Sequence, residues 1–203
     1  MSTVSHVQPT NLQQYKGENY WKKAFDLLEA DLKATLSATN THKLNVLNEV
    51  LDKVEKSRQT CIRRQWKVKL PSGKMVILRD VVEKMIGWIH RYKEVGTIAI
   101  QYDPVHAALP WAAFIFLLDV SLGDIQMFAA VVMDLEFIAL LLCRCSVYEK
   151  LYIGSSATTL DSLEDALVCL YSETLTHLSK CLQYFEKKTG CRFKTIHITQ
   201  KMS

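Results

Sequence analysis

Residues 107–142 read AALPWAAFIFLLDVSLGDIQMFAAVVMDLEFIALLL, and this stretch decides the fold class. It holds two apolar segments separated by Gly123 and Asp124. Apolar residues occupy nearly every side of a helix built from the second segment, which is typical of a helix surrounded by others. We therefore predict that 107–122 and 125–142 form the central, buried hairpin of a helical bundle. The alternative is a membrane-active hairpin that a rearrangement releases.

The flanking segments carry apolar residues at three- and four-residue steps, the spacing of one helix face. The fold class predicted from them is all-α, a multi-helix bundle of long antiparallel helices. One exception is 66–78, where alternation around a Pro-Ser-Gly turn favours a short β-hairpin as strongly as an extended corner. Four of the predicted helices are 18–38, 42–66, 105–122 and 125–152. Another is capped by Asp80 and ends near Gly96. The last runs from Thr158 or Thr159 to Lys188, and Gly190 is predicted to end it.

These elements predict one domain at 17–190, between a flexible leader at 1–16 and a tail at 191–203. The chain has 203 residues, of which 49% are apolar, so it is long enough to bury a sizeable core. Seven Gly and four Pro are too few for a many-stranded β fold. The net charge of +4 is mild, so no nucleic-acid partner is expected.

The first residues lack the basic and apolar regions of a signal peptide, so a cytoplasmic location is predicted. The six cysteines are then expected to be reduced and mostly buried. A membrane span is not expected either, because Asp119 ends the first apolar run and Asp134 and Glu136 interrupt the second.

No catalytic apparatus is recognisable, and no cofactor is expected, since no glycine-rich phosphate loop exists. Cys143 and Cys145 diverge around a helix and cannot share one metal ion unaided. His177 and Cys181 do share a face, but two ligands do not make a metal site, so the prediction is none. A cysteine–histidine hydrolase remains the weakest of the alternatives.

One stretch, from Lys53 to Lys69, is strongly basic and is offset only by Glu55. A basic helix end with an aromatic residue suits an anionic membrane surface or an acidic partner. The alternative is a solvated face that complements the helix dipole. The residues that would form such a surface are Lys56, Arg58, Arg63, Arg64, Trp66, Lys67 and Lys69.

Residues 101–114 read QYDPVHAALPWAAF, and the surrounding spacing includes Ile86-Gly-Trp88 and a late helix at 163–171. This pattern resembles the helical N-terminal domain that precedes the NACHT NTPase module in fungal NOD-like receptors of the STAND class. The positions that carry the resemblance have a structural role in our interpretation, with Asp103 capping the segment that Pro104 begins. They are Asp103, Pro104, His106, Leu109, Pro110 and Trp111.

The resemblance implies a signalling or effector domain, either part of a receptor or a stand-alone relative. It would transmit an oligomerisation signal toward a cell-death or incompatibility response, with membrane engagement on activation as one route. Related HeLo-type bundles attack membranes with an apolar N-terminal helix, whereas 1–16 is polar here. The alternative function is a non-catalytic adaptor. Its partners would be proteins, through self-association or docking on a receptor NTPase module.

Overall fold

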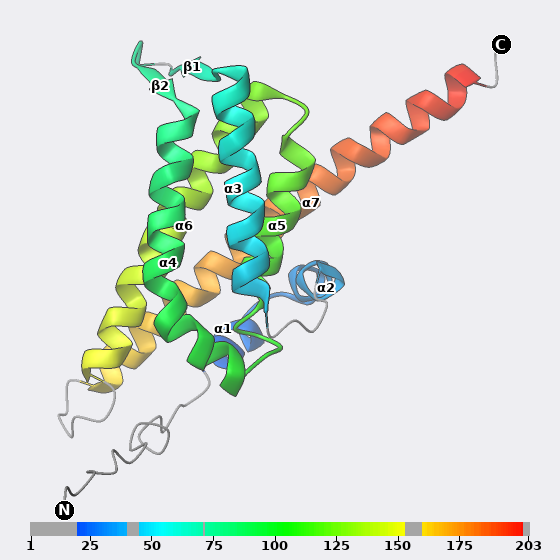
Figure 1. The fold of residues 1–203 in the computed structure, drawn as a ribbon. Helices are drawn as coiled ribbons and strands as arrows, with labels where there is room; N and C mark the ends of the chain where they lie inside the picture. The colour runs from blue at the N-terminus through cyan, green and yellow to red at the C-terminus, as the bar shows by residue number, and fades with distance from the viewer. Residues whose placement is uncertain (1–19, 40–44, 71, 153–159, 201–203) are drawn as a thin grey trace, which may run out of the picture.

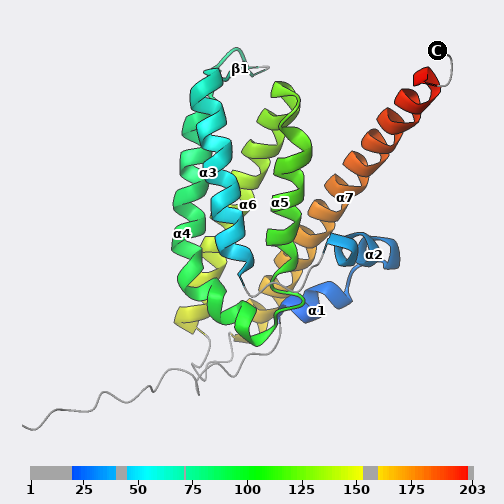
Figure 2. The ribbon, with the colours of Figure 1, turned by 45° about the vertical axis from the view of Figure 1, so that its right-hand side comes forward.

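The computed structural model describes residues 20–39, 45–70, 72–152 and 160–200, and it confirms the all-α bundle. The helices between residues 46 and 152 stand side by side as an antiparallel group, while the last helix crosses them obliquely beside the first two (Figure 1 and Figure 2). The elements are α1 (Tyr20–Asp26), α2 (Ala30–Thr39), α3 (Val46–Arg64), β1 (Lys67–Lys69), β2 (Met75–Ile77), α4 (Leu78–Tyr102), α5 (Leu109–Ser121), α6 (Ile125–Tyr152) and α7 (Leu160–Gln200).

The predicted first helix is wrong in one respect, because it breaks into α1 and α2. At the end of α1 the amides of Leu27 and Leu28 bond to carbonyls three residues back, which tightens the last turn. The break lets the two pieces pack on different parts of α7. Trp21 of α1 stacks on Tyr171 at 4.0 Å between ring centroids. In α2 the Leu32 carbonyl accepts a hydrogen bond from the Ser179 hydroxyl at 3.0 Å.

A short hairpin joins α3 to α4, as one of the two sequence alternatives predicted. Helix α3 ends because Gln65 adopts the left-handed conformation, with φ 49°, which turns the chain out of the helix. Strands β1 and β2 then pair antiparallel, with Val68 opposite Val76. Val68 is buried, so one face of the hairpin closes the end of the bundle.

Helix α4 differs from its prediction at both ends. It begins at Leu78, directly after β2, so Asp80 is not its cap but lies in its first turn, where it pairs with Arg79 at 2.7 Å. It also passes through Gly96 and ends at Tyr102, two residues before Pro104, which cannot lie in a helix interior. Gly96 lies inside the helix, where the absence of a side chain leaves space for the ring of Tyr92. An added Cβ would stand only 1.9 Å from the ring of Tyr92.

Helices α5 and α6 form the predicted central hairpin, but only α5 is largely buried. The segment 104–108 is a turn, so α5 starts at Leu109 instead of Val105. Complete burial is wrong for α6, because only 44% of its most apolar 18-residue window is buried and Phe137 is 60% exposed. By length and composition Ile125–Glu149 could cross a membrane, although core helices of soluble proteins pass this test too.

Helix α7 is longer than predicted. It continues through Gly190 to Gln200, so Gly190 is not its terminal residue and 191–200 are not an extended tail. A glycine costs a helix only about 1 kcal/mol, and no proline follows this one to stop it. The predicted leader at 1–16 and the predicted caps Thr158 and Thr159 lie outside the described residues.

Candidate functional sites: a basic hairpin end and a groove along α6 and α7

The motif that carries the family resemblance begins with a capped turn. The Asp103 carboxylate accepts hydrogen bonds from the backbone amides of Val105 and His106, at 3.3 and 3.1 Å. The same carboxylate lies 2.9 Å from Nδ1 of His106. Pro104 between them fixes the backbone for the turn. Asp103 and His106 thus hold the chain between α4 and α5.

The rest of the motif lies in the core. Leu109, Pro110 and Trp111 open α5 and are buried, with the proline in the first turn, where its missing amide costs nothing. The Trp111 ring packs against Tyr92 of α4 and Phe114 of α5, at 4.8 and 5.1 Å between centroids. Its indole N–H has no hydrogen-bond partner in the described chain. These contacts give the motif a structural position away from any open surface.

Two of the predicted basic-surface residues do not belong to an open cationic patch. Arg58 is held by Glu55 at 2.7 Å and Glu83 of α4 at 3.3 Å, and these contacts raise its pKa. Trp66 is half-buried, with its ring 5.1 Å from that of Phe128 on α6 and the Arg64 guanidinium 5.3 Å from its centroid. Trp66 therefore attaches the hairpin to the bundle.

The structure gathers the other basic residues near the end of α3. The exception is Lys56, which is exposed about two helical turns before that end. Lys67 and Lys69 point outward from β1, where they pair across the strands with Ile77 and Met75. Met75 is 55% exposed and Ile77 is 38% exposed. One face of the hairpin thus alternates cationic and apolar side chains. We call this surface the hairpin end, made of Ile62, Arg63, Arg64, Lys67, Lys69, Lys74, Met75 and Ile77.

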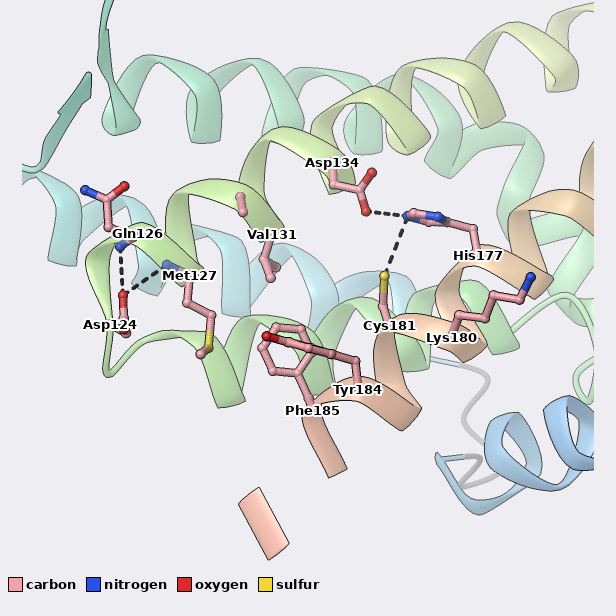
Figure 3. Close-up of a pocket in the computed structure, with 11 residues that line it drawn as sticks. Asp124, Gln126, Met127, Val131, Asp134, His177, Lys180, Cys181, Tyr184 and Phe185 are labelled. Carbon is pink, nitrogen blue, oxygen red and sulfur yellow. Dashed lines mark hydrogen bonds and ion pairs between the residues drawn. The ribbon is translucent and has the colours of Figure 1, made fainter. Parts of the chain in front are cut away.

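Sequence reasoning missed a groove between the exposed side of α6 and α7 (Figure 3). It holds about 570 Å³, within the range of small-molecule sites. A second hollow of about 590 Å³ adjoins it, and the two share Asp134 and His177. The walls are largely apolar, including Met127, Val131, Phe137, Ile138, Leu141, Tyr184 and Phe185.

Three chemically reactive side chains meet where the two hollows join. His177 Nε2 lies 2.6 Å from the Asp134 carboxylate and 3.6 Å from the Cys181 sulfur. The pKa of the Cys181 thiol is raised by burial and by the negative charge of Asp134, so the sulfur is protonated near neutral pH.

This arrangement is not the triad of a cysteine hydrolase. A triad needs the nucleophile on one ring nitrogen of the base and the carboxylate on the other. Here both Asp134 and Cys181 contact Nε2 of His177. Such enzymes also depend on a lowered cysteine pKa, whereas that of Cys181 is raised.

The remaining thiols have two environments. Cys61, Cys143 and Cys145 are buried, and burial raises the pKa of Cys61 and Cys145 to about 11. Cys169 is exposed on α7. The five cysteines Cys61, Cys143, Cys145, Cys169 and Cys181 are free thiols, and three of them are buried as expected.

Comparison with known proteins gives one match. The model of a domain of unknown function, DUF7708, matches residues 80–199, which cover α4 to α7 and more than half of the chain. No curated protein and no solved structure matches. The chain belongs to the DUF7708 family.

Proposed function

We propose that this DUF7708 chain is a cytoplasmic signalling domain, of the kind that precedes the NACHT module in fungal NOD-like receptors. In this proposal the hairpin end binds an anionic membrane surface when the domain is brought into an oligomer. The receptor part of the proposal rests on the resemblance of residues 101–114, which lie inside the matched family region.

The observation that carries the membrane part is the outward face of the hairpin. Its apolar members, Met75 and Ile77, stand directly opposite Lys69 and Lys67. Apolar side chains that enter the headgroup layer beside lysines that reach lipid phosphates are the composition of an interfacial surface. Neither lysine forms an ion pair within the described residues, so both charges are available to an anionic partner.

Oligomerisation would make a weak interaction effective. Each basic residue near an anionic membrane contributes about 1 kcal/mol, so one hairpin end binds with modest strength. Copies joined in one assembly bind together, and their combined affinity exceeds that of a single copy by orders of magnitude. The domain would therefore bind an anionic membrane weakly as a monomer and much more tightly when a receptor clusters it.

The test is co-sedimentation with vesicles of phosphatidylcholine, with and without phosphatidylserine, at low and high salt. Replacing Lys67 and Lys69 by Gln removes two charges, which should weaken binding to the anionic vesicles by about 2 kcal/mol, or roughly 30-fold. The control carries Arg144→Gln and Lys187→Gln, two exposed charges on α6 and α7 away from the hairpin. Equal binding by the wild type and the hairpin variant would refute the membrane role.

The second candidate is a structural adaptor that binds a protein without touching lipid. The apolar groove along α6 favours it, since exposed residues such as Phe137 suit a partner helix. A tight complex with an isolated NACHT module, insensitive to salt and lost in Phe137→Ser, would support this candidate. Retention of the complex in that variant would exclude the groove as the docking surface.

A further inference from the structure

The groove along α6 and α7 contains a set of converging donor atoms that the proposed function does not use. The Asp134 carboxylate, His177 Nε2 and Cys181 Sγ all lie within 4.8 Å of one another. They come from two helices, since Asp134 projects from α6 while His177 and Cys181 are one turn apart on α7 (Figure 3). Their common point faces the hollow and can be reached from solvent.

The contacts among the three side chains leave one of them without a good hydrogen bond. A neutral imidazole nitrogen either donates one proton or accepts one, so Nε2 of His177 cannot serve both neighbours well. If it donates to Asp134 at 2.6 Å, the Cys181 sulfur at 3.6 Å is left with a weak contact. A cation between the three would bind all of them at once.

The donor set selects the kind of cation. Ca²⁺ and Mg²⁺ prefer sites rich in oxygen, and this cluster offers one carboxylate with an imidazole and a thiolate. Zn²⁺ accepts all three donors, at about 2.0 Å for oxygen and nitrogen and about 2.3 Å for sulfur. In a tetrahedron those bond lengths place nitrogen and sulfur about 3.5 Å apart. The observed separation of His177 Nε2 and Cys181 Sγ is 3.6 Å. The Asp134 oxygen, which lies 2.6 Å from Nε2, would have to move to about 3.3 Å from it to make room for the ion.

The position of the cluster indicates what such an ion would do. Helix α7 packs mainly on α1, α2 and α5, and it touches α6 over a much smaller contact. Asp134 and His177 lie at that small contact, where the two hollows of the groove meet. An ion held there would fasten α7 to the exposed apolar side of α6.

We propose that Asp134, His177 and Cys181 bind a Zn²⁺ ion that clamps α7 to α6. The fourth coordination position opens to the groove and is filled by water. Binding releases the proton of the Cys181 thiol, because the thiolate is the ligand. The inference goes beyond the proposed membrane role and uses none of its residues.

Cobalt gives a direct test on the full chain after treatment with a chelator and a reductant. Co²⁺ at this site should produce the absorption bands of a tetrahedral complex and a thiolate-to-cobalt charge-transfer band, and Zn²⁺ should abolish both. Cys181→Ser should lose the charge-transfer band, while Cys169→Ser, which removes the exposed thiol of the same helix, should keep it. An unchanged band in Cys181→Ser would overturn the assignment, and so would the absence of any band in the wild type.

Affinity for Zn²⁺, measured by competition with a chromophoric chelator, provides the second readout. Loss of even an outer-shell partner weakens metal binding about 10- to 100-fold, so His177→Ala and Asp134→Asn should each weaken it by at least about 100-fold. The control His90→Ala removes an exposed histidine from α4 and should leave the affinity unchanged. Equal loss in the control would mean that Zn²⁺ binds surface histidines generally, which would overturn the proposal.

The zinc-binding experiments and the vesicle experiment test the two proposals independently. Far-ultraviolet circular dichroism checks that each variant is folded, and all three ligands are at least partly exposed, so their replacement leaves the core intact. A chain that binds Zn²⁺ but not anionic vesicles would keep this inference and refute the membrane role. A chain that binds anionic vesicles but not Zn²⁺ would keep the membrane role and refute this inference.

Discussion

Two glycines of α4 offer a matched test of the packing described above. Gly87 and Gly96 lie in the same helix, so replacing either by alanine brings the same gain in helix propensity, about 0.5–1 kcal/mol. Their surroundings differ. An added Cβ meets nothing within 4 Å at Gly87, but at Gly96 it would stand 1.9 Å from the nearest ring carbon of Tyr92.

The magnitude at Gly96 follows from what the ring must do. Ordinary carbon contacts are about 3.5–4 Å, so the Tyr92 ring would have to move by roughly 1.5–2 Å. It cannot swing into solvent, because Tyr92 is 2% exposed and its ring packs on Trp111. Overpacking of this kind costs about 1–3 kcal/mol, which exceeds the propensity gain. Gly96→Ala should therefore lose about 1–2 kcal/mol, whereas Gly87→Ala should gain about 0.5–1 kcal/mol.

Thermal and urea unfolding followed by circular dichroism would measure both changes. For a chain of this length 1 kcal/mol shifts Tm by about 2–4 °C, so the two variants should move in opposite directions and differ by several degrees. The urea m-value should stay constant, because the change is local. If Gly96→Ala were as stabilising as Gly87→Ala, the close approach of Tyr92 would be refuted as the reason for glycine there.

Two further predictions concern the turn before α5 and the thiols. Asp103→Ala removes the acceptor for two backbone amides and should cost about 1–2 kcal/mol in urea unfolding, while Asp103→Asn should retain most of that stability; equal loss in both would show that the capping bonds do not matter. At pH 7.5 a maleimide should label the exposed Cys169 rapidly, and Cys145, buried with a pKa of about 11, only when denaturant is added. Rapid labelling of Cys145 in the native chain, detected by peptide mapping, would contradict the packing of α6.

The helices could be predicted from sequence because their apolar faces are local patterns, but several of their ends could not. Asp80 and Gly190 are ordinary signals for the start and the end of a helix. At the start of α4 the preceding strand already positions the chain, so the helix begins before the acidic residue. From the sequence Gly96 is an ordinary end signal. In the structure the glycine is needed because the ring of Tyr92 lies against it, a contact that only the three-dimensional arrangement reveals.

The two candidate sites differ in how much of each could be predicted from the sequence. The reason is the distance along the chain between the residues that form each site. The hairpin end is built from residues 62–77, and a basic run already indicated its cationic residues between 63 and 69. The apolar residues opposite the lysines, Met75 and Ile77, needed the structure, and so did the turning inward of Trp66 and the pairing of Arg58. In the groove, His177 and Cys181 were recognised as sharing a helix face. Asp134 lies 43 residues before His177, and its only sequence signal is that it is one of two acids, with Glu136, in an apolar run.

The position of Asp134 changes how the exposed side of α6 is interpreted. A carboxylate in an apolar stretch is costly to bury without a partner, so it is expected to have a specific contact. Asp134 finds this contact on α7, beside the apolar hollow that Phe137 and Leu141 of α6 line. If a metal ion strengthens that contact, then loss of the ion would expose more of α6, the one described helix long and apolar enough to cross a membrane. The clamp and the hairpin end would then control different steps, the first governing access to α6 and the second the approach to a charged surface.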